Sequence, residues 1–155
     1  MNINPDSPKI IFPPPLIFLI FVLIGHFING YYPLPLFQNP IKLALTLIFF
    51  FAGLFLGAYS FWLFKKNKTD PLPWMPTTKI ISTGPYKYSR NPMYLSLVLI
   101  GFSISKFLSN GWIFLMMFPF LLVMDRYVVK REEEYLIKKF GQEYLDYQKK
   151  VRRWI

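Results

Sequence analysis

The sequence lacks cysteine altogether, and His26 is its only histidine. Without cysteine there is no disulfide, no thiolate metal site and no cysteine nucleophile, and we predict no metal centre. The chain also has no glycine-rich loop between a strand and a helix, the feature by which soluble Rossmann-type enzymes hold nucleotide cofactors. These absences exclude several common classes of soluble enzyme.

Apolar residues, in contrast, are abundant: 54% of the chain is hydrophobic and 20% aromatic, and the mean hydropathy is +0.32. This composition is too apolar for a small soluble domain. It predicts an all-α, polytopic integral membrane protein in which residues 1–155 form one membrane-embedded domain.

Four apolar segments are expected to form membrane helices, since about 20 helical residues cross a bilayer. They are Ile10–Ile28, Ile41–Phe64, Met93–Leu108 and Trp112–Val129. The first helix is expected to begin near Pro15 and the fourth to bend at Pro119. The third segment is short and ends near Lys106, so it forms either a short span or half of a hairpin that dips into the membrane.

The distribution of positive charge predicts the orientation of the chain. Of the 18 lysines and arginines, six lie between Lys65 and Arg90 and nine between Arg126 and Arg153, whereas Asn29–Pro40 contains none. Because basic loops stay on the cytoplasmic side, both termini are predicted to be cytoplasmic. The net charge of +10 then reflects topology and attraction to anionic lipids, and we expect no nucleic-acid partner.

A pair of glycines in the second apolar segment, Gly53 and Gly57, is typical of close helix packing. Packing against another span of the same chain is the favoured interpretation, with dimerisation as the alternative. The sequence leaves the oligomeric state open.

The polar stretch GPYKYSRNPMYLS, residues 84–96, lies at the start of the third apolar segment. Pro92 suits the first turn of a helix and Asn91 is a favoured N-cap, so a helix is expected to begin here. Its free N–H groups, with Arg90 beside them, would bind a carboxylate or phosphate. Tyr86, Tyr88 and Tyr94 would line a pocket for a base or a lipid. The alternative is an ordinary loop at the membrane entrance.

The segment Asp125–Ile155 predicts a cytoplasmic amphipathic helix that lies on membrane or protein and breaks at Gly141. Asp125 and Glu132 are seven residues apart, so they are expected to share a helix face and to form a carboxylate pair in a cytoplasmic pocket. A cationic ligand with hydroxyl groups would suit such a pair. The alternative is that nearby lysines and arginines simply neutralise these acidic residues.

Together these two stretches resemble the isoprenylcysteine carboxyl methyltransferase family, which is itself similar to the phospholipid N-methyltransferases. The residues that carry the resemblance are Gly84–Ser96, Arg131, Glu132, Glu133, Leu136, Phe140, Gly141, Tyr144, Tyr147 and Val151–Trp154. The similarity covers about residues 71–155, which it marks as the cofactor-binding half, and the chain looks like a short prokaryotic member.

The resemblance implies a membrane methyltransferase that binds S-adenosylmethionine on its cytoplasmic side and methylates a lipid-like or small hydrophobic acceptor. The cofactor-binding residues that it implies are Gly84, Pro85, Tyr86, Arg90, Asn91, Pro92, Tyr94, Glu132 and Glu133. Arg90 and Arg126 are the candidate catalytic residues, with Arg126 expected to hold an anionic acceptor.

The chain departs from the family pattern at Asn91, where the family has histidine, and at Ser96, where glycine is usual. Asparagine does not titrate, so no proton transfer is expected at this position. Two other functions are compatible with parts of the pattern: an NADPH-dependent reductase similar to the sterol reductases, and a membrane scaffold without enzymatic activity.

Overall fold

The computed structural model describes residues 5–36 and 41–155, so the end of the predicted Asn29–Pro40 loop lies outside the described residues. The elements run α1 (Pro14–Tyr31), α2 (Lys42–Lys66), the 3-10 turn η1 (Gly84–Lys87), α3 (Pro92–Phe107), α4 (Gly111–Val123), the π-helical segment η2 (Met124–Val129), α5 (Lys130–Phe140) and α6 (Gln142–Lys150). The all-α prediction is confirmed.

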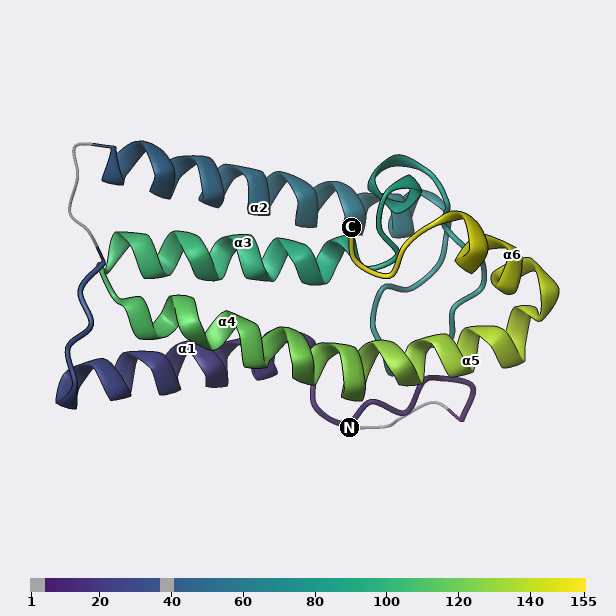
Figure 1. Ribbon diagram of the computed structural model, residues 1–155. Helices are drawn as coiled ribbons and strands as arrows, with labels where there is room; N and C mark the ends of the chain where they lie inside the picture. The colour runs from purple at the N-terminus through teal and green to yellow at the C-terminus, as the bar shows by residue number, and fades with distance from the viewer. Residues whose placement is uncertain (1–4, 37–40) are drawn as a thin grey trace.

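Helices α1 to α4 lie side by side as a bundle, and α5 and α6 extend beyond one end of it (Figure 1). Helix α3 packs between α2 and α4, and α1 packs against α4. The core between α1, α3 and α4 contains Ile17, Val98, Met117 and Phe120, all of which are buried. This packing leaves the polar start of α3 at the same end of the bundle as α5 and α6.

The outer surface of the bundle is apolar, as expected of a membrane protein. Phe27 on α1, Phe55 on α2 and Phe118 on α4 all expose more than half of their surface. Large apolar patches of this kind are costly in water and favourable in lipid. By length and composition, three helices within residues 5–36 and 41–155 qualify as spans: α1, α2 and the continuous helix Gly111–Phe140, which joins α4, η2 and α5. Helix α3 is apolar but has only 16 residues.

The two glycines of α2 face α3. A Cβ atom added at Gly57 would lie 2.8 Å from Ser96 Oγ, and one added at Gly53 would lie 2.9 Å from Ile100 Cγ1. Both glycines are therefore used for close packing within the chain, which is the favoured of the two sequence interpretations.

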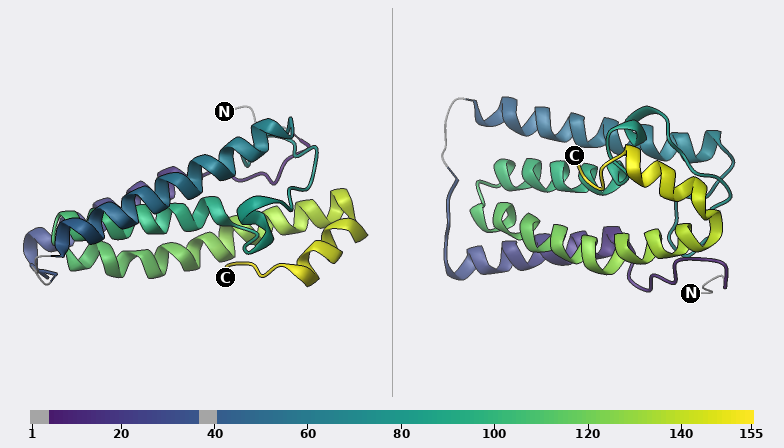
Figure 2. Two further views of the ribbon diagram at one scale, coloured as in Figure 1. Left: turned by 90° about the horizontal axis from the view of Figure 1, so that it is seen from above. Right: turned by 45° about the vertical axis from the view of Figure 1, so that its right-hand side comes forward.

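The amphipathic C-terminal segment consists of two helices rather than one. Gly141 separates α5 from α6 with φ +55°, a conformation that favours glycine, as its position in the sequence predicted. Tyr144 and Val151 are buried, so this face packs against the protein. Figure 2 shows the segment after α6 turning back toward the start of α3.

Candidate functional site

A cavity of about 100 Å³, partly open to solvent, lies between the start of α3, the helices α5 and α6, and the loop between α2 and η1. Among the residues that line it are Tyr86, Arg90, Asn91, Tyr94, Glu132 and Glu133. The structure thus brings together two polar stretches that lie about 40 residues apart in the sequence, as the hydrogen bond between Arg90 and Glu133 (|i−j| = 43) shows. We refer to this space as the polar cavity.

The start of α3 is held by contacts different from those the sequence suggested. Asn91 occupies the N-cap position, but its side chain makes no capping hydrogen bond. Its Nδ2 instead donates to the carbonyl of Arg153 at 2.9 Å, and Ser89 Oγ accepts a hydrogen bond from the Asn91 backbone N–H. The prediction that the Asn91 side chain caps the helix was therefore wrong, because this side chain is hydrogen-bonded to residue Arg153 near the C-terminus.

Arg90 lines the cavity, and both terminal nitrogens of its guanidinium are hydrogen-bonded within the protein. Its Nη1 donates to the carbonyls of Gln148 and Val151, and its Nη2 donates to Glu133 at 2.6 Å. Its buried Nε finds no hydrogen-bond partner among the described residues. A buried donor of this kind costs free energy unless a ligand or water satisfies it, so Nε marks a place for an acceptor oxygen.

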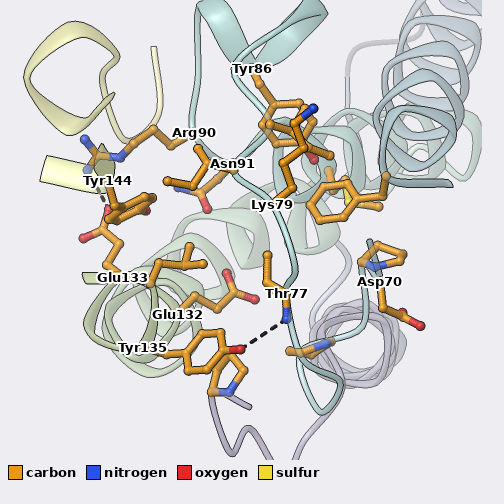
Figure 3. A pocket seen from close by; sticks show the side chains of 18 of the residues that line it. Asp70, Thr77, Lys79, Tyr86, Arg90, Asn91, Glu132, Glu133, Tyr135 and Tyr144 are labelled. Atoms are coloured by element: carbon orange, nitrogen blue, oxygen red, sulfur yellow. Dashed lines mark hydrogen bonds and ion pairs between the residues drawn. The ribbon is translucent and has the colours of Figure 1, made fainter. Parts of the chain in front are cut away.

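The two glutamates differ in their partners. Glu133 forms ion pairs with Arg90 at 2.6 Å and Arg153 at 2.5 Å. Glu132 accepts a hydrogen bond from the Tyr94 hydroxyl at 2.5 Å, and within the described part of the chain it forms no ion pair. Figure 3 shows the Glu132 carboxylate pointing into the cavity and the Glu133 carboxylate pointing toward Arg90.

The expected pair of Asp125 and Glu132 does not form. The π-helical segment Met124–Val129 adds a residue to the turn, so residues eight apart share a face in place of residues seven apart. Asp125 consequently lies with Glu133, and Arg153 bonds both of their carboxylates. Sequence spacing alone gave the wrong partner because it assumed an uninterrupted α-helix.

Tyrosines form much of the remaining wall. The Tyr147 hydroxyl donates to the Tyr86 carbonyl at 2.7 Å, and Tyr144 and Tyr147 contact each other through their rings. Burial raises the pKa of Tyr86, Tyr144 and Tyr147 above the ordinary tyrosine value, so their hydroxyls stay neutral at physiological pH. Neutral aromatic walls of this kind suit a flat, uncharged ring system.

The loop before η1 forms another wall of the polar cavity. Tyr135 Oη accepts a hydrogen bond from the Thr77 backbone N–H at 3.2 Å (Figure 3). The same hydroxyl donates to the Asp6 carbonyl, and Lys139 pairs with the Asp6 carboxylate. No pattern in the sequence pointed to Thr77 or Tyr135 as site residues, because these contacts join distant parts of the chain.

Four residues expected at the site do not line the cavity: Gly84, Pro85, Tyr88 and Pro92. Gly84 has φ +59°, and an added Cβ would lie 2.9 Å from Leu63 Cδ1 on α2, so this glycine fits η1 against α2. Arg126 also lies outside the cavity lining; its side chain is 77% exposed, and its Nε is 3.7 Å from Asp125 Oδ2.

A second, apolar cavity of about 480 Å³ adjoins the polar one. It lies between the prolines that start α1, the glycine face of α2 and the first turns of α3. The two cavities share Pro71–Pro73, Met93 and Tyr94 as a common wall. Tyr94 is therefore bonded to Glu132 in the polar cavity and is also part of the apolar cavity's lining.

This architecture defines a class: a helical membrane protein with a polar, tyrosine-lined cavity at one end of its bundle and an apolar cavity next to it. The phospholipid methyltransferase family matches residues 41–143, about two thirds of the chain. The chain belongs to this family and is a membrane protein of methyltransferase type.

The matched residues include the start of α3 and both glutamates. They exclude α1 and residues 144–155, which comprise most of α6 and the end of the chain. The match confirms the predicted relation to the phospholipid methyltransferases, while the isoprenylcysteine subtype stays a prediction. An uncharacterized protein of Haemophilus influenzae is 46% identical over 63 residues, which is 41% of this chain and 100% of that protein. No solved structure matches the chain.

Proposed function

We propose that this protein is an S-adenosylmethionine-dependent methyltransferase of the isoprenylcysteine carboxyl methyltransferase type. In this proposal the cofactor binds in the polar cavity. The acceptor is a lipid-like or small hydrophobic molecule that reaches the apolar cavity from the bilayer. The family assignment supports methyl transfer in general, and the cavity residues support this particular cofactor.

One observation carries the proposal: the polar cavity presents an unsatisfied cationic donor and a carboxylate that forms no ion pair among the described residues. Arg90 offers a buried Nε donor without a partner among the described residues, and Glu132 offers a partly buried carboxylate that is hydrogen-bonded to a neutral hydroxyl. A carboxylate that is removed from water without a cation nearby is costly. An amino-acid zwitterion complements both groups, and S-adenosylmethionine contains one.

The remaining parts of the cofactor have matching surfaces. We assign its carboxylate to Arg90 and the start of α3, where the helix dipole favours an anion. Its ammonium is assigned to Glu132, and its adenine to the aromatic wall at Tyr86 and Tyr147. Glu133 is assigned no contact with the cofactor, because both of its oxygens are bonded to arginines.

The cofactor supplies a methyl group on a positively charged sulfur. Transfer of such a group needs alignment and exclusion of water more than acid or base groups. The common wall of Met93 and Tyr94 keeps the two cavities adjacent, so a nucleophile in the apolar cavity reaches the polar one over a short distance. A carboxylate acceptor attacks directly, whereas an amine has to be neutral first.

The test is calorimetric titration of S-adenosylhomocysteine into detergent-purified protein, with NADPH titrated in parallel. The proposal predicts binding of S-adenosylhomocysteine with a Kd on the order of micromolar and no binding of NADPH. Binding of NADPH alone would identify a reductase. Binding of neither compound would remove the polar cavity as a nucleotide-cofactor site.

A further inference from the structure

The C-terminal segment Val151–Ile155 is bound tightly to the polar cavity, although it lies outside the residues that match the family. The carbonyl of Arg152 accepts a hydrogen bond from the Arg90 backbone N–H at 3.0 Å. The carbonyl of Arg153 accepts hydrogen bonds from Ser89 Oγ at 3.3 Å and from Asn91 Nδ2 at 2.9 Å. The segment thus holds the three residues that precede α3.

The Arg153 guanidinium joins two carboxylates. It donates to both oxygens of Glu133, at 3.2 and 2.5 Å, and to both oxygens of Asp125, at 3.1 and 3.2 Å. Trp154 Nε1 also donates to Asp125, at 3.0 Å. These bonds hold Glu133 in place together with Arg90, since Glu133 Oε1 accepts from both arginines.

Charge balance gives Arg153 a second effect. Arg90 and Arg153 together match the charges of Asp125 and Glu133, while Arg126 is largely exposed and therefore screened by solvent. Without Arg153, Asp125 would be left with the exposed Arg126, and among the described residues the charge of Glu133 would fall on the guanidinium of Arg90 alone. That guanidinium would then attract an anionic ligand less strongly.

We infer that Arg153 is a positioning residue of the cofactor site: it shares the neutralisation of Glu133 with Arg90 and also neutralises Asp125, so that the Arg90 guanidinium, through its unpartnered Nε, can attract the ligand's carboxylate. The inference rests on the proposed function. It assigns a role to a residue of the C-terminal segment that makes no contact with the ligand itself.

The experiment compares the affinity of four variants for S-adenosylhomocysteine by calorimetry. Arg153→Ala is expected to weaken binding about tenfold, because a carboxylate without a neutralising partner then weakens the attraction of Arg90 for the ligand's carboxylate. Arg152→Ala is the matched control, because it removes the same charge from the neighbouring exposed side chain, and it is expected to bind like the wild type. Arg153→Lys is expected to retain part of the affinity.

The fourth variant separates charge from structure. Asp125→Asn combined with Arg153→Ala restores the charge balance, and the new side-chain amide oxygen keeps an acceptor for Trp154, so this variant should recover most of the lost affinity. Equal binding by Arg153→Ala and Arg152→Ala would overturn the inference. Loss of binding that the double variant does not recover would also overturn it, because it would show a structural role alone.

If the wild type binds no S-adenosylhomocysteine, the proposed function fails, and amide hydrogen exchange decides the role of Arg153 separately. Arg153→Ala should then speed exchange in the peptide that contains Ser89–Asn91, relative to Arg152→Ala. Equal exchange in the two variants would overturn the positioning role.

Discussion

At the scale of single residues, two adjacent glutamates have different surroundings and therefore different roles. Glu133 is enclosed by two arginines, whereas Glu132 is hydrogen-bonded to Tyr94. The family resemblance named both residues as cofactor ligands, but no feature of the sequence distinguished them. The distinction depends on Arg153, which is 20 residues from Glu133 and reaches it only after the chain reverses at Gly141.

This difference predicts the behaviour of Glu132→Gln. Loss of the carboxylate should weaken binding of S-adenosylhomocysteine about tenfold, the effect of removing one charge-assisted hydrogen bond. The unfolding temperature in detergent should stay the same or rise, since a costly, partly buried charge disappears. Glu134→Gln is the matched control, because the Glu134 side chain is 64% exposed and pairs only with Lys130, at 4.0 Å, among the described residues. Equal affinity in both variants would exclude Glu132 from the site.

At the scale of helices, local signals in the sequence predicted most of the boundaries. Pro92 begins α3 and Gly141 ends α5. The fixed φ of proline and the tolerance of glycine for positive φ are properties of the residues themselves and do not depend on the surrounding fold. The π-helical segment Met124–Val129 was not predicted, because a π-turn has no comparable sequence signal. Its effect on the site is large: it places Asp125 beside Glu133 and away from Glu132.

Helix packing supplies a prediction at the same scale. An added Cβ at Gly25 on α1 would lie 2.9 Å from the backbone of Ile113 on α4, whereas one at Gly30 would meet nothing within 4 Å. Gly25→Ala should therefore destabilise the protein by about 1–3 kcal/mol, and Gly30→Ala by less than about 0.5 kcal/mol. Thermal unfolding in detergent measures both variants. Equal unfolding temperatures would show that α1 and α4 do not approach as closely as described.

At the scale of the whole molecule, the composition predicted a helical membrane protein, and the exposed phenylalanines on α1, α2 and α4 agree with it. The sequence predicted a polar pocket but not its full walls or the apolar cavity beside it, because these walls combine the prolines at the start of α1, the loop before η1 and helices far apart in the chain. The sequence indicated site residues at the start of α3 and on α5, but it did not predict which side chains they contact.

The orientation of the molecule stays a prediction that the absence of cysteine makes simple to test. Ile155 and Tyr32 are exposed, at 83% and 71%, and are suitable positions for single cysteines. In right-side-out membrane vesicles, an impermeant maleimide should label Tyr32→Cys at once and Ile155→Cys only after permeabilisation. The reverse pattern would place the C-terminus, and the polar cavity with it, outside the cell.

The central claim is that the polar cavity holds S-adenosylmethionine, and photolabelling tests it most directly. Ultraviolet irradiation of the purified protein with methyl-tritiated S-adenosylmethionine should attach label to peptides that contain Tyr86–Tyr94 or Glu132–Tyr147, and excess S-adenosylhomocysteine should prevent it. Label that excess S-adenosylhomocysteine does not reduce, or label confined to peptides away from the cavity, would contradict the account.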